Sequence, residues 1–137
     1  MRPVDKKFKV TQAYGNGSKL YKSGMHKGTD FGCPVGTPVV AMNDGVVTEF
    51  TWGPSFGLHL VVDHVPFADG TAGLWAGYMH LSKIKVKSGQ KVKRGQIIGW
   101  SGQSGHVTGP HLHVEVQNNK GKWNALKSVD PQKWIEA

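Results

Sequence analysis

Cysteine is nearly absent from the 137-residue sequence, which contains only Cys33. A single cysteine cannot form an intramolecular disulfide, and it excludes a zinc site made of several thiolates. Any metal ion must therefore be bound by histidine, aspartate or glutamate. We expect Cys33 itself to be a small, buried, structural side chain.

Long hydrophobic runs are also absent. The apolar stretches at residues 39–42 and 60–62 fall far short of the roughly 20 residues that a membrane-spanning helix needs. The N-terminal segment 1–7 is charged, but it is not followed by the apolar segment that a secretory signal peptide requires. The sequence therefore predicts no transmembrane segment and shows no signal peptide.

Acidic residues are scarce, since nine Asp and Glu stand against 17 Lys and Arg and give a formal net charge of +8. This excess favours a polyanionic partner, and acidic polymers, nucleic acids and acidic membranes all satisfy that argument. The chain has no uninterrupted basic tract and no aromatic signature of RNA binding. We therefore do not expect nucleic acid to be the partner.

Short β-type segments separated by glycine turns make up most of the chain, which contains 19 glycines. Residues 36–48 indicate two strands joined at Asp44-Gly45, because glycine tolerates the backbone of a tight hairpin turn. Asp130 followed by proline can start a brief C-terminal helix. We predict an all-β fold, an antiparallel sheet or sandwich with long loops and little helix, in one domain over residues 1–137.

Histidine is plentiful, and the segment His111-Leu112-His113 is the most informative of the histidine motifs. Side chains alternate between the two faces of a strand, so His111 and His113 share one face with Glu115, while Leu112 and Val114 point to the other. This pattern suits one metal ligand beside one general base. Two histidines on a solvated strand would produce the same pattern.

His26 and Asp30 form a second pair, in a glycine-containing segment that indicates an irregular turn rather than a helix. With one histidine of the 111/113 pair, they offer two nitrogens and one oxygen and leave a fourth position for water, as in catalytic zinc sites. His80 and the other histidine of the pair would then be available for proton transfer. Each motif taken alone also fits an ordinary structural histidine.

Taken in order, these motifs resemble those of the lysostaphin-type (LytM-type) zinc endopeptidases, which cut peptide bonds in bacterial peptidoglycan. GMHKGTDF at 24–31 resembles the His-x-x-x-Asp motif of that family, and YMHLS at 78–82 resembles its third histidine segment. GQIIGWSG at 95–102 and GPHLH at 109–113 resemble its final hairpin and His-x-His motif. The resemblance covers about residues 24–116 and implies a groove-forming fold of the duplicated-hybrid-motif type.

The resemblance also implies roles for five residues. It implies that His26, Asp30 and His113 bind one Zn²⁺ per chain. It implies that His80 and His111 are catalytic histidines that do not bind the metal, and that they position the water, take its proton and assist the developing oxyanion or the leaving amine.

Other residues are candidates for contact with the substrate. Relatives place a tyrosine upstream of the first zinc histidine, and of the two tyrosines available, Tyr14 and Tyr21, we favour Tyr21. Trp52 and Trp75 lie in or beside loops that we expect to flank the groove, although each also fits an aromatic side chain packed under a loop. His106 precedes the last motif and either touches substrate or is a solvated loop residue.

The function that the resemblance implies is that of a zinc endopeptidase that hydrolyses cross-bridge or stem peptides of peptidoglycan and so lyses the cell wall. The alternative is a degenerate domain of the same fold, which binds wall peptide or activates an amidase. We expect a monomer whose positive charge attracts anionic wall polymers. Because no signal peptide is visible, we expect release by host lysis or a holin, or carriage on a phage particle, as for a phage endolysin; a bacteriocin or autolysin domain without its leader is the alternative.

Overall fold

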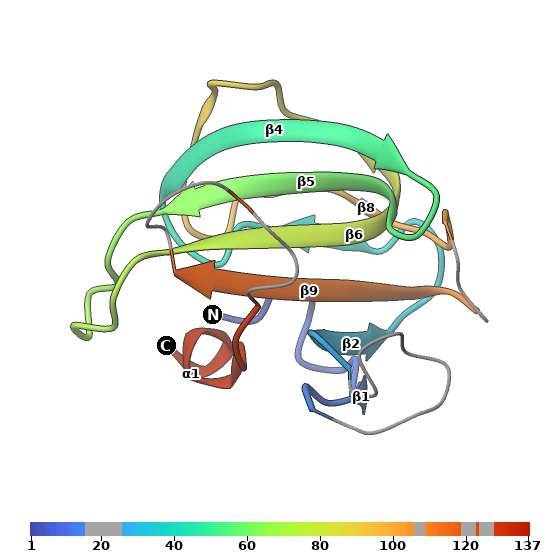
Figure 1. Cartoon of the computed structure of the whole chain (residues 1–137), viewed down its shortest axis with the longest axis horizontal. Coiled ribbons are helices and arrows are strands. Elements are labelled where there is room, and N and C mark those ends of the chain that lie inside the picture. Colours follow the sequence, from blue (N-terminus) through green and yellow to red (C-terminus); the bar gives the residue numbers. More distant parts are fainter. Residues whose placement is uncertain (16–25, 106–108, 119–122, 124–127) are drawn as a thin grey trace.

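The computed structural model describes residues 1–15, 26–105, 109–118, 123 and 128–137. Over these residues the strands form an antiparallel sheet, and the predicted all-β class is confirmed (Figure 1). In chain order the elements are β1 (Val10–Gln12), β2 (Thr29–Gly32), β3 (Pro38–Val40), β4 (Gly45–Gly53), β5 (Gly57–His64), β6 (Leu74–Ile84), β7 (Lys91–Val92), β8 (Ile97–Ser101), β9 (His111–Asn118) and α1 (Gln132–Glu136).

The sheet forks along its longest strand, β6. The main order of strands is β1-β2-β9-β6-β5-β4-β7, while β8 pairs with both β3 and β6. Residues 74–79 of β6 pair with β9, and residues 81–84 pair with β8. One edge of β6 therefore changes partner at residue 80.

The two faces of β9 differ in chemistry, as the alternation of its sequence predicts. Leu112 and alternate residues after it are buried in a hydrophobic core, which also contains Cys33, as expected. The opposite face of this part of the sheet carries His111, His113 and Glu115, and we call it the histidine face. Because neighbouring residues of one strand serve the core and the histidine face, core packing also fixes the position of the histidines.

The predicted hairpin at Asp44-Gly45 is wrong. Strand β3 pairs with β8, whereas β4 pairs with β5 and β7. The Asp44 carbonyl accepts a hydrogen bond from the Val65 N–H at 3.0 Å, so the turn is tied to the residue after β5. Gly45 is needed for close approach rather than for a hairpin turn, because a Cβ there would lie 2.4 Å from the Asp63 carbonyl oxygen.

The C-terminal helix α1 is present as predicted. The Asp130 carboxylate accepts a hydrogen bond from the Gln132 N–H at 3.0 Å, at the start of the helix. The two ends of the chain meet beside α1, where the Met1 ammonium donates to backbone oxygens of Trp134 and Ala137, each at 2.7 Å. Over the described residues, no helix is long and apolar enough to cross a bilayer.

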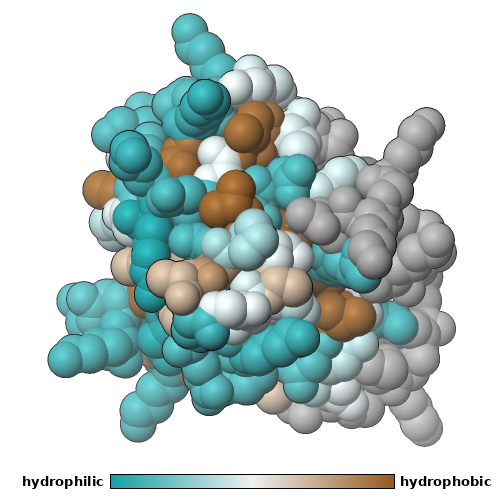
Figure 2. Space-filling view, turned by 90° about the vertical axis from the view of Figure 1, so that its left-hand side faces the viewer, coloured by the Kyte–Doolittle hydropathy of each residue, from teal (hydrophilic) through white to brown (hydrophobic). Residues whose placement is uncertain are grey.

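One end of the molecule, on the left in Figure 1, is mainly hydrophilic at its surface (Figure 2). Hydrophobic residues stand there singly or in small groups among hydrophilic ones. This pattern is typical of a solvated surface, where scattered apolar side chains need no further explanation.

Candidate metal centre and catalytic site

Three side chains that could hold a metal ion converge on the histidine face. His26, Asp30 and His113 each bring one ligand atom within 4.8 Å of the others, and all three residues are buried. Asp30 of β2 lies directly opposite His113 of β9 in the antiparallel register. Strand pairing therefore joins the two motifs, and the structure brings together the three residues that the sequence resemblance implies as ligands.

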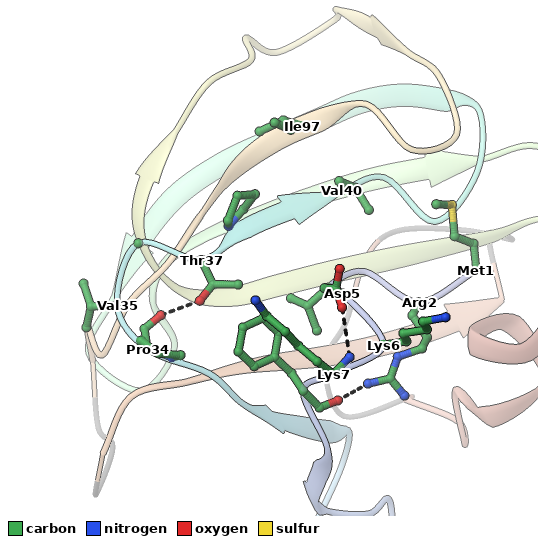
Figure 3. Close-up of a pocket in the computed structure, with 14 residues that line it drawn as sticks. Met1, Arg2, Asp5, Lys6, Lys7, Pro34, Val35, Thr37, Val40 and Ile97 are labelled. Carbon is green, nitrogen blue, oxygen red and sulfur yellow. Dashed lines mark hydrogen bonds between the residues drawn. The ribbon is translucent and has the colours of Figure 1, made fainter.

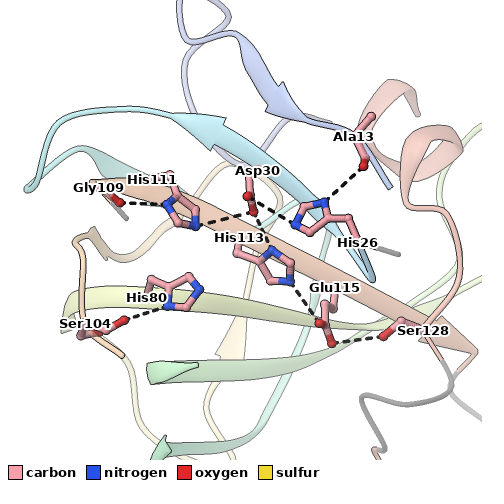
Figure 4. A network of polar contacts seen from close by, with 10 residues as sticks. All are labelled: Ala13, His26, Asp30, His80, Ser104, Gly109, His111, His113, Glu115 and Ser128. Atoms are coloured by element: carbon pink, nitrogen blue, oxygen red, sulfur yellow. Dashed lines mark hydrogen bonds and ion pairs between the residues drawn. The ribbon is translucent and has the colours of Figure 1, made fainter. Parts of the chain in front are cut away.

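Asp30 lies at the centre of this cluster (Figure 4). Its Oδ1 is 2.6 Å from His113 Nδ1, and its Oδ2 is 3.3 Å from His26 Nε2. His111 Nε2 is 3.7 Å from Oδ1. Burial opposes ionisation of this carboxyl, but the hydrogen bonds from His113 and His26 outweigh it and lower the pKa of Asp30 well below its usual range. The cluster therefore contains a buried carboxylate at neutral pH.

Three of the clustered histidines, His26, His80 and His111, are fixed through Nδ1 by a backbone carbonyl. The bonds run from His26 to Ala13 (3.2 Å), from His111 to Gly109 (2.9 Å) and from His80 to Ser104 (2.7 Å). Because a carbonyl oxygen can only accept, Nδ1 of each ring carries the proton, and in the neutral ring Nε2 keeps its lone pair. Each of these rings can therefore offer Nε2 as a ligand or as a proton acceptor.

His80 reaches the histidine face because β6 is irregular at this residue. Strict alternation from the core residue Tyr78 would turn His80 toward the core, yet it is Leu81 that packs there. The register with β5 shifts between Tyr78 and Leu81, and His80 has a φ of +62°. Its N–H donates to the Phe56 carbonyl at 2.9 Å. A bulge of this kind redirects one side chain, and here it places the His80 ring 4.9 Å from the ring of His111.

His80 is uncharged at neutral pH. Burial lowers the pKa of the His80 ring to about 4, although its hydrogen bond to the Ser104 carbonyl favours the charged form. Ser104 is itself held by two bonds, since its Oγ donates to the Leu81 carbonyl at 2.7 Å and accepts from the Leu58 N–H at 3.0 Å. The loop that carries Ser104 therefore fixes the orientation of His80.

Unlike the other three rings, His113 bonds side-chain carboxylates through both of its nitrogens and does not bond a backbone carbonyl through Nδ1. Its Nδ1 faces Asp30, and its Nε2 donates to Glu115 Oε1 at 3.0 Å. Burial disfavours charge on this ring, but the hydrogen bonds to Asp30 and Glu115 outweigh it and raise the pKa of His113 to about 9. Gly28 packs against the ring, because a Cβ there would lie 2.9 Å from two His113 ring atoms. The ring is therefore confined by its neighbours.

The tyrosine and loop-histidine predictions fall on different parts of the chain. Tyr21 and His106 lie outside the described residues. Tyr14 lies inside them, and its hydroxyl donates to the Ser128 carbonyl at 3.1 Å. Tyr14 is therefore bound to the C-terminal segment.

The two tryptophans differ in their place on the sheet. Trp52 is 61% exposed on β4 and pairs with Leu58, next to the turn that contains Phe56, the partner of the His80 N–H. Trp75 lies opposite Gln117 on β9, four residues beyond His113, and its exposure is intermediate. Trp52 thus lies at the end of the β4–β5 hairpin that contacts His80, whereas Trp75 lies near the start of β6.

Several supporting residues were not identified from the sequence. Ala13, Ser104 and Gly109 act through backbone carbonyls, and every residue has a carbonyl, so no side-chain pattern reveals them. Ser128 contacts Glu115 from a distant part of the chain, and only the folded structure shows that contact.

A cavity of about 900 Å³ lies apart from the histidines (Figure 3). Its walls come from the N-terminal segment and the chain around β3, and the lining residues are Met1, Arg2, Val4, Asp5, Lys6, Lys7, Phe8, Pro34, Val35, Gly36, Thr37, Pro38, Val40 and Ile97. Because none of the clustered histidines lines this cavity, the candidate site is defined by its side-chain chemistry and not by the size of a hollow.

Comparison with protein families identifies the relationship of the chain. The model of peptidase family M23 matches residues 24–125, which include all five residues that the sequence resemblance implies as ligands or catalytic histidines. The chain belongs to peptidase family M23. The predicted resemblance to lysostaphin-type enzymes is confirmed at the level of the family.

Curated relatives of this M23 chain are considerably longer. Peptidoglycan DD-endopeptidase ShyA of Vibrio cholerae is 42% identical over 133 residues, which are 94% of this chain and 29% of the relative. Lysostaphin of Staphylococcus simulans is 42% identical over 135 residues, which are 95% of this chain and 25% of the relative. The chain thus spans less than a third of the length of either relative.

Solved structures with the same fold include one chain that this chain covers almost entirely. The catalytic domain of the antimicrobial peptidase lysostaphin from S. simulans superposes with a TM-score of 0.83 at 36% identity, covering 96% of this M23 chain and 94% of that one. A zinc-containing peptidase from V. cholerae gives a TM-score of 0.76 at 36% identity, covering 99% of this chain and 39% of that one.

Proposed function

We propose that this M23 chain is a zinc-dependent endopeptidase that hydrolyses peptide bonds of bacterial peptidoglycan. The observation that carries the proposal is the convergence of two imidazole nitrogens and one carboxylate oxygen within 4.8 Å, with two further histidines beside them. Relatives named as a peptidoglycan DD-endopeptidase and a glycyl-glycine endopeptidase, the latter from Staphylococcus capitis, support it. The substrate is accordingly a stem peptide or a cross-bridge.

The donor set fits zinc. Two histidine nitrogens and one carboxylate oxygen are three protein ligands, which leave the open fourth position typical of catalytic zinc sites. The buried charge of Asp30 also favours a cation at this point. We assign His26, Asp30 and His113 as the ligands of one zinc ion per chain. Zinc bound here supplies Lewis acidity, which makes water more acidic and a peptide carbonyl more electrophilic.

His80 and His111 move the protons of the proposed reaction. Each ring holds a proton on Nδ1 through a backbone carbonyl and leaves Nε2 able to accept one. Peptide hydrolysis removes a proton from water and delivers one to the leaving amine, so a pair of neighbouring histidines can accept the first and donate the second. A covalent protein nucleophile is not needed.

The wider predictions extend the same proposal. Tyr21 assists the developing negative charge, and Trp52, Trp75 and His106 contact the substrate. Residues 1–137 act as one monomeric domain at the bacterial cell wall, after host lysis or on a phage particle, and the net charge of +8 favours anionic wall polymers.

The test is mass spectrometry of purified peptidoglycans from several wall types after digestion. The arms are wild type, chelated protein, zinc-restored protein, His111→Ala, and Asp69→Asn as a control at an exposed carboxylate. New amino termini are expected with wild type, zinc-restored protein and the control, and their sequence identifies the bond. If no wall yields new termini although each chain binds one zinc, the endopeptidase proposal fails and the degenerate binding domain takes its place.

A further inference from the structure

Glu115 is a buried acidic residue whose two carboxylate oxygens are both engaged. It is 3% exposed on the histidine face of β9. Its Oε1 accepts from His113 Nε2 at 3.0 Å, and its Oε2 accepts from the Ser128 hydroxyl at 3.1 Å (Figure 4). A carboxylate is costly to bury unless such bonds compensate it, so this arrangement defines one orientation of the Glu115 side chain.

That orientation determines which nitrogen of His113 faces the other two proposed ligands, His26 and Asp30. His26 turns Nε2 toward Asp30, because its Nδ1 is bonded to a carbonyl. His113 instead presents Nδ1 to Asp30; when Nδ1 gives up its proton to bind a metal, the remaining proton is held on Nε2, where Glu115 accepts it. Ligating histidines are typically fixed by an acceptor on the outer nitrogen, which sets the tautomer and the angle of the ring.

Ser128 extends this support to a second part of the chain. Its hydroxyl binds Glu115 and its carbonyl accepts the Tyr14 hydroxyl, while the adjacent Ala13 carbonyl holds His26. Residues 13–14 and 128 therefore support the two proposed histidine ligands, His26 directly and His113 through Glu115. All three of these residues lie outside the segment 24–125 that the family model matches.

We propose that Glu115, held in place by Ser128, is a positioning residue that fixes His113 with its proton on Nε2 and its Nδ1 lone pair directed at the metal. This inference rests on the proposed function for the identity of the metal. Without the carboxylate, the ring can adopt its other tautomer or rotate away from Asp30. Metal affinity should then fall although all three ligands are present.

The test measures zinc affinity of the full chain by competition with a chromophoric chelator. The variants are Glu115→Ala, Glu115→Gln and Ser128→Ala, with Glu136→Gln as a control that removes a carboxylate from α1. Glu115→Ala should weaken zinc binding about 10- to 100-fold, the range for partners behind a metal ligand. Glu115→Gln should lose less because its amide oxygen can still accept from Nε2, and Ser128→Ala should lose a few-fold for one hydrogen bond.

Two further readouts separate positioning from a merely structural role. Thermal unfolding of the metal-free variants reports stability, and the visible absorption spectrum of Co²⁺-substituted protein reports ligand geometry. If Glu115 positions His113, Glu115→Gln should change the Co²⁺ spectrum while its thermal stability stays nearly the same. Ser128→Thr, which keeps a hydroxyl, should bind zinc more tightly than Ser128→Ala. If Glu115→Ala does not fold, the zinc affinities and Co²⁺ spectra of Glu115→Gln and Ser128→Ala test the positioning role.

The outcomes also distinguish this inference from the proposed function. Zinc affinity within about twofold of wild type in both folded Glu115→Gln and Ser128→Ala, with an unchanged Co²⁺ spectrum, would overturn the positioning role. Failure of the wild-type chain to bind zinc at all would overturn it too. Zinc binding that depends on Glu115, without cleavage of any peptidoglycan, would support the inference while the proposed function fails.

Discussion

His64 and His113 are two buried histidines in the same sheet, and their pKa values are shifted in opposite directions. His64 lies on the core face of β5, where burial lowers its pKa to about 4. The pKa of His113, on the histidine face of β9, is instead raised to about 9. Burial opposes charge on both rings, so the difference comes from their partners.

The partners of His64 are neutral, whereas those of His113 are carboxylates. His64 Nε2 accepts from the Tyr78 hydroxyl at 2.7 Å, and its Nδ1 donates to the Asp44 carbonyl at 3.3 Å. His113 lies between the carboxylates of Asp30 and Glu115. The comparison shows that the depth of a histidine does not decide its role, because one face of the sheet stabilises a neutral ring and the other favours positive charge.

The largest effect, a loss of zinc affinity, is expected from Asp30→Asn, which removes the carboxylate that contacts His113. Loss of one of three proposed ligands should weaken zinc binding more than about 100-fold, beyond the range for residues that only support a ligand. Chelator competition and release of new amino termini from peptidoglycan measure the two consequences. Wild-type affinity in this variant would remove Asp30 from the ligand set.

Acid should destabilise the protein through His64. The unfolded ring binds a proton below about pH 6.5 and the folded ring below about 4, so between these values the unfolded state binds more protons and stability falls as pH falls. The expected loss is about 3 kcal/mol of unfolding free energy across that window. Urea unfolding of wild type and His64→Gln at neutral pH and near pH 4 tests this, since the difference between the two should shrink in acid. A constant difference would show that His64 does not titrate in this way.

Tyr78→Phe should lower stability while leaving zinc affinity unchanged. The substitution removes the hydroxyl that donates to His64 and accepts from the Met42 N–H at 3.1 Å. Leaving such buried groups without a partner costs about 1–3 kcal/mol. Chemical denaturation and zinc competition on one preparation measure both quantities. A large change in zinc affinity would show that the two faces of the sheet are coupled.

The smallest change in stability is expected for Trp52→Ala, because this side chain is mostly exposed. Stability should stay within about 0.5 kcal/mol of wild type, as for most surface substitutions. If Trp52 contacts substrate as proposed, KM for a soluble wall fragment should rise with little change in the melting temperature. An unchanged KM would leave Trp52 as a surface residue without a substrate role.

Local alternation allowed much of the site to be predicted from the sequence. Period-two spacing placed His111, Glu115 and His113 on one face of a strand, and the structure confirms that placement. The position of His80 could not be derived in this way, because a bulge reverses its direction. The resemblance to a family supplied that residue, whereas alternation alone would have turned it toward the core.

Pairing between distant strands was harder to predict. Asp44-Gly45 has the composition of a hairpin turn, but strand partners are decided by packing across the whole sheet, which a short segment does not encode. The supporting contacts of Ser104 and Ser128 are non-local in the same way. Sequence patterns therefore predicted which side chains lie together better than they predicted the groups that hold them.

The fork in β6 has a consequence for how the fold can diversify. Strand β6 leaves β9 and joins β8 on either side of His80, and this is where the β4–β5 turn and the loop after β8 meet, through Phe56 and Ser104. Changes in the length or composition of those two connections alter the surroundings of His80, while the pairing of β2 with β9, which holds Asp30 opposite His113, remains intact. One scaffold can therefore vary what surrounds the clustered histidines without rebuilding its centre.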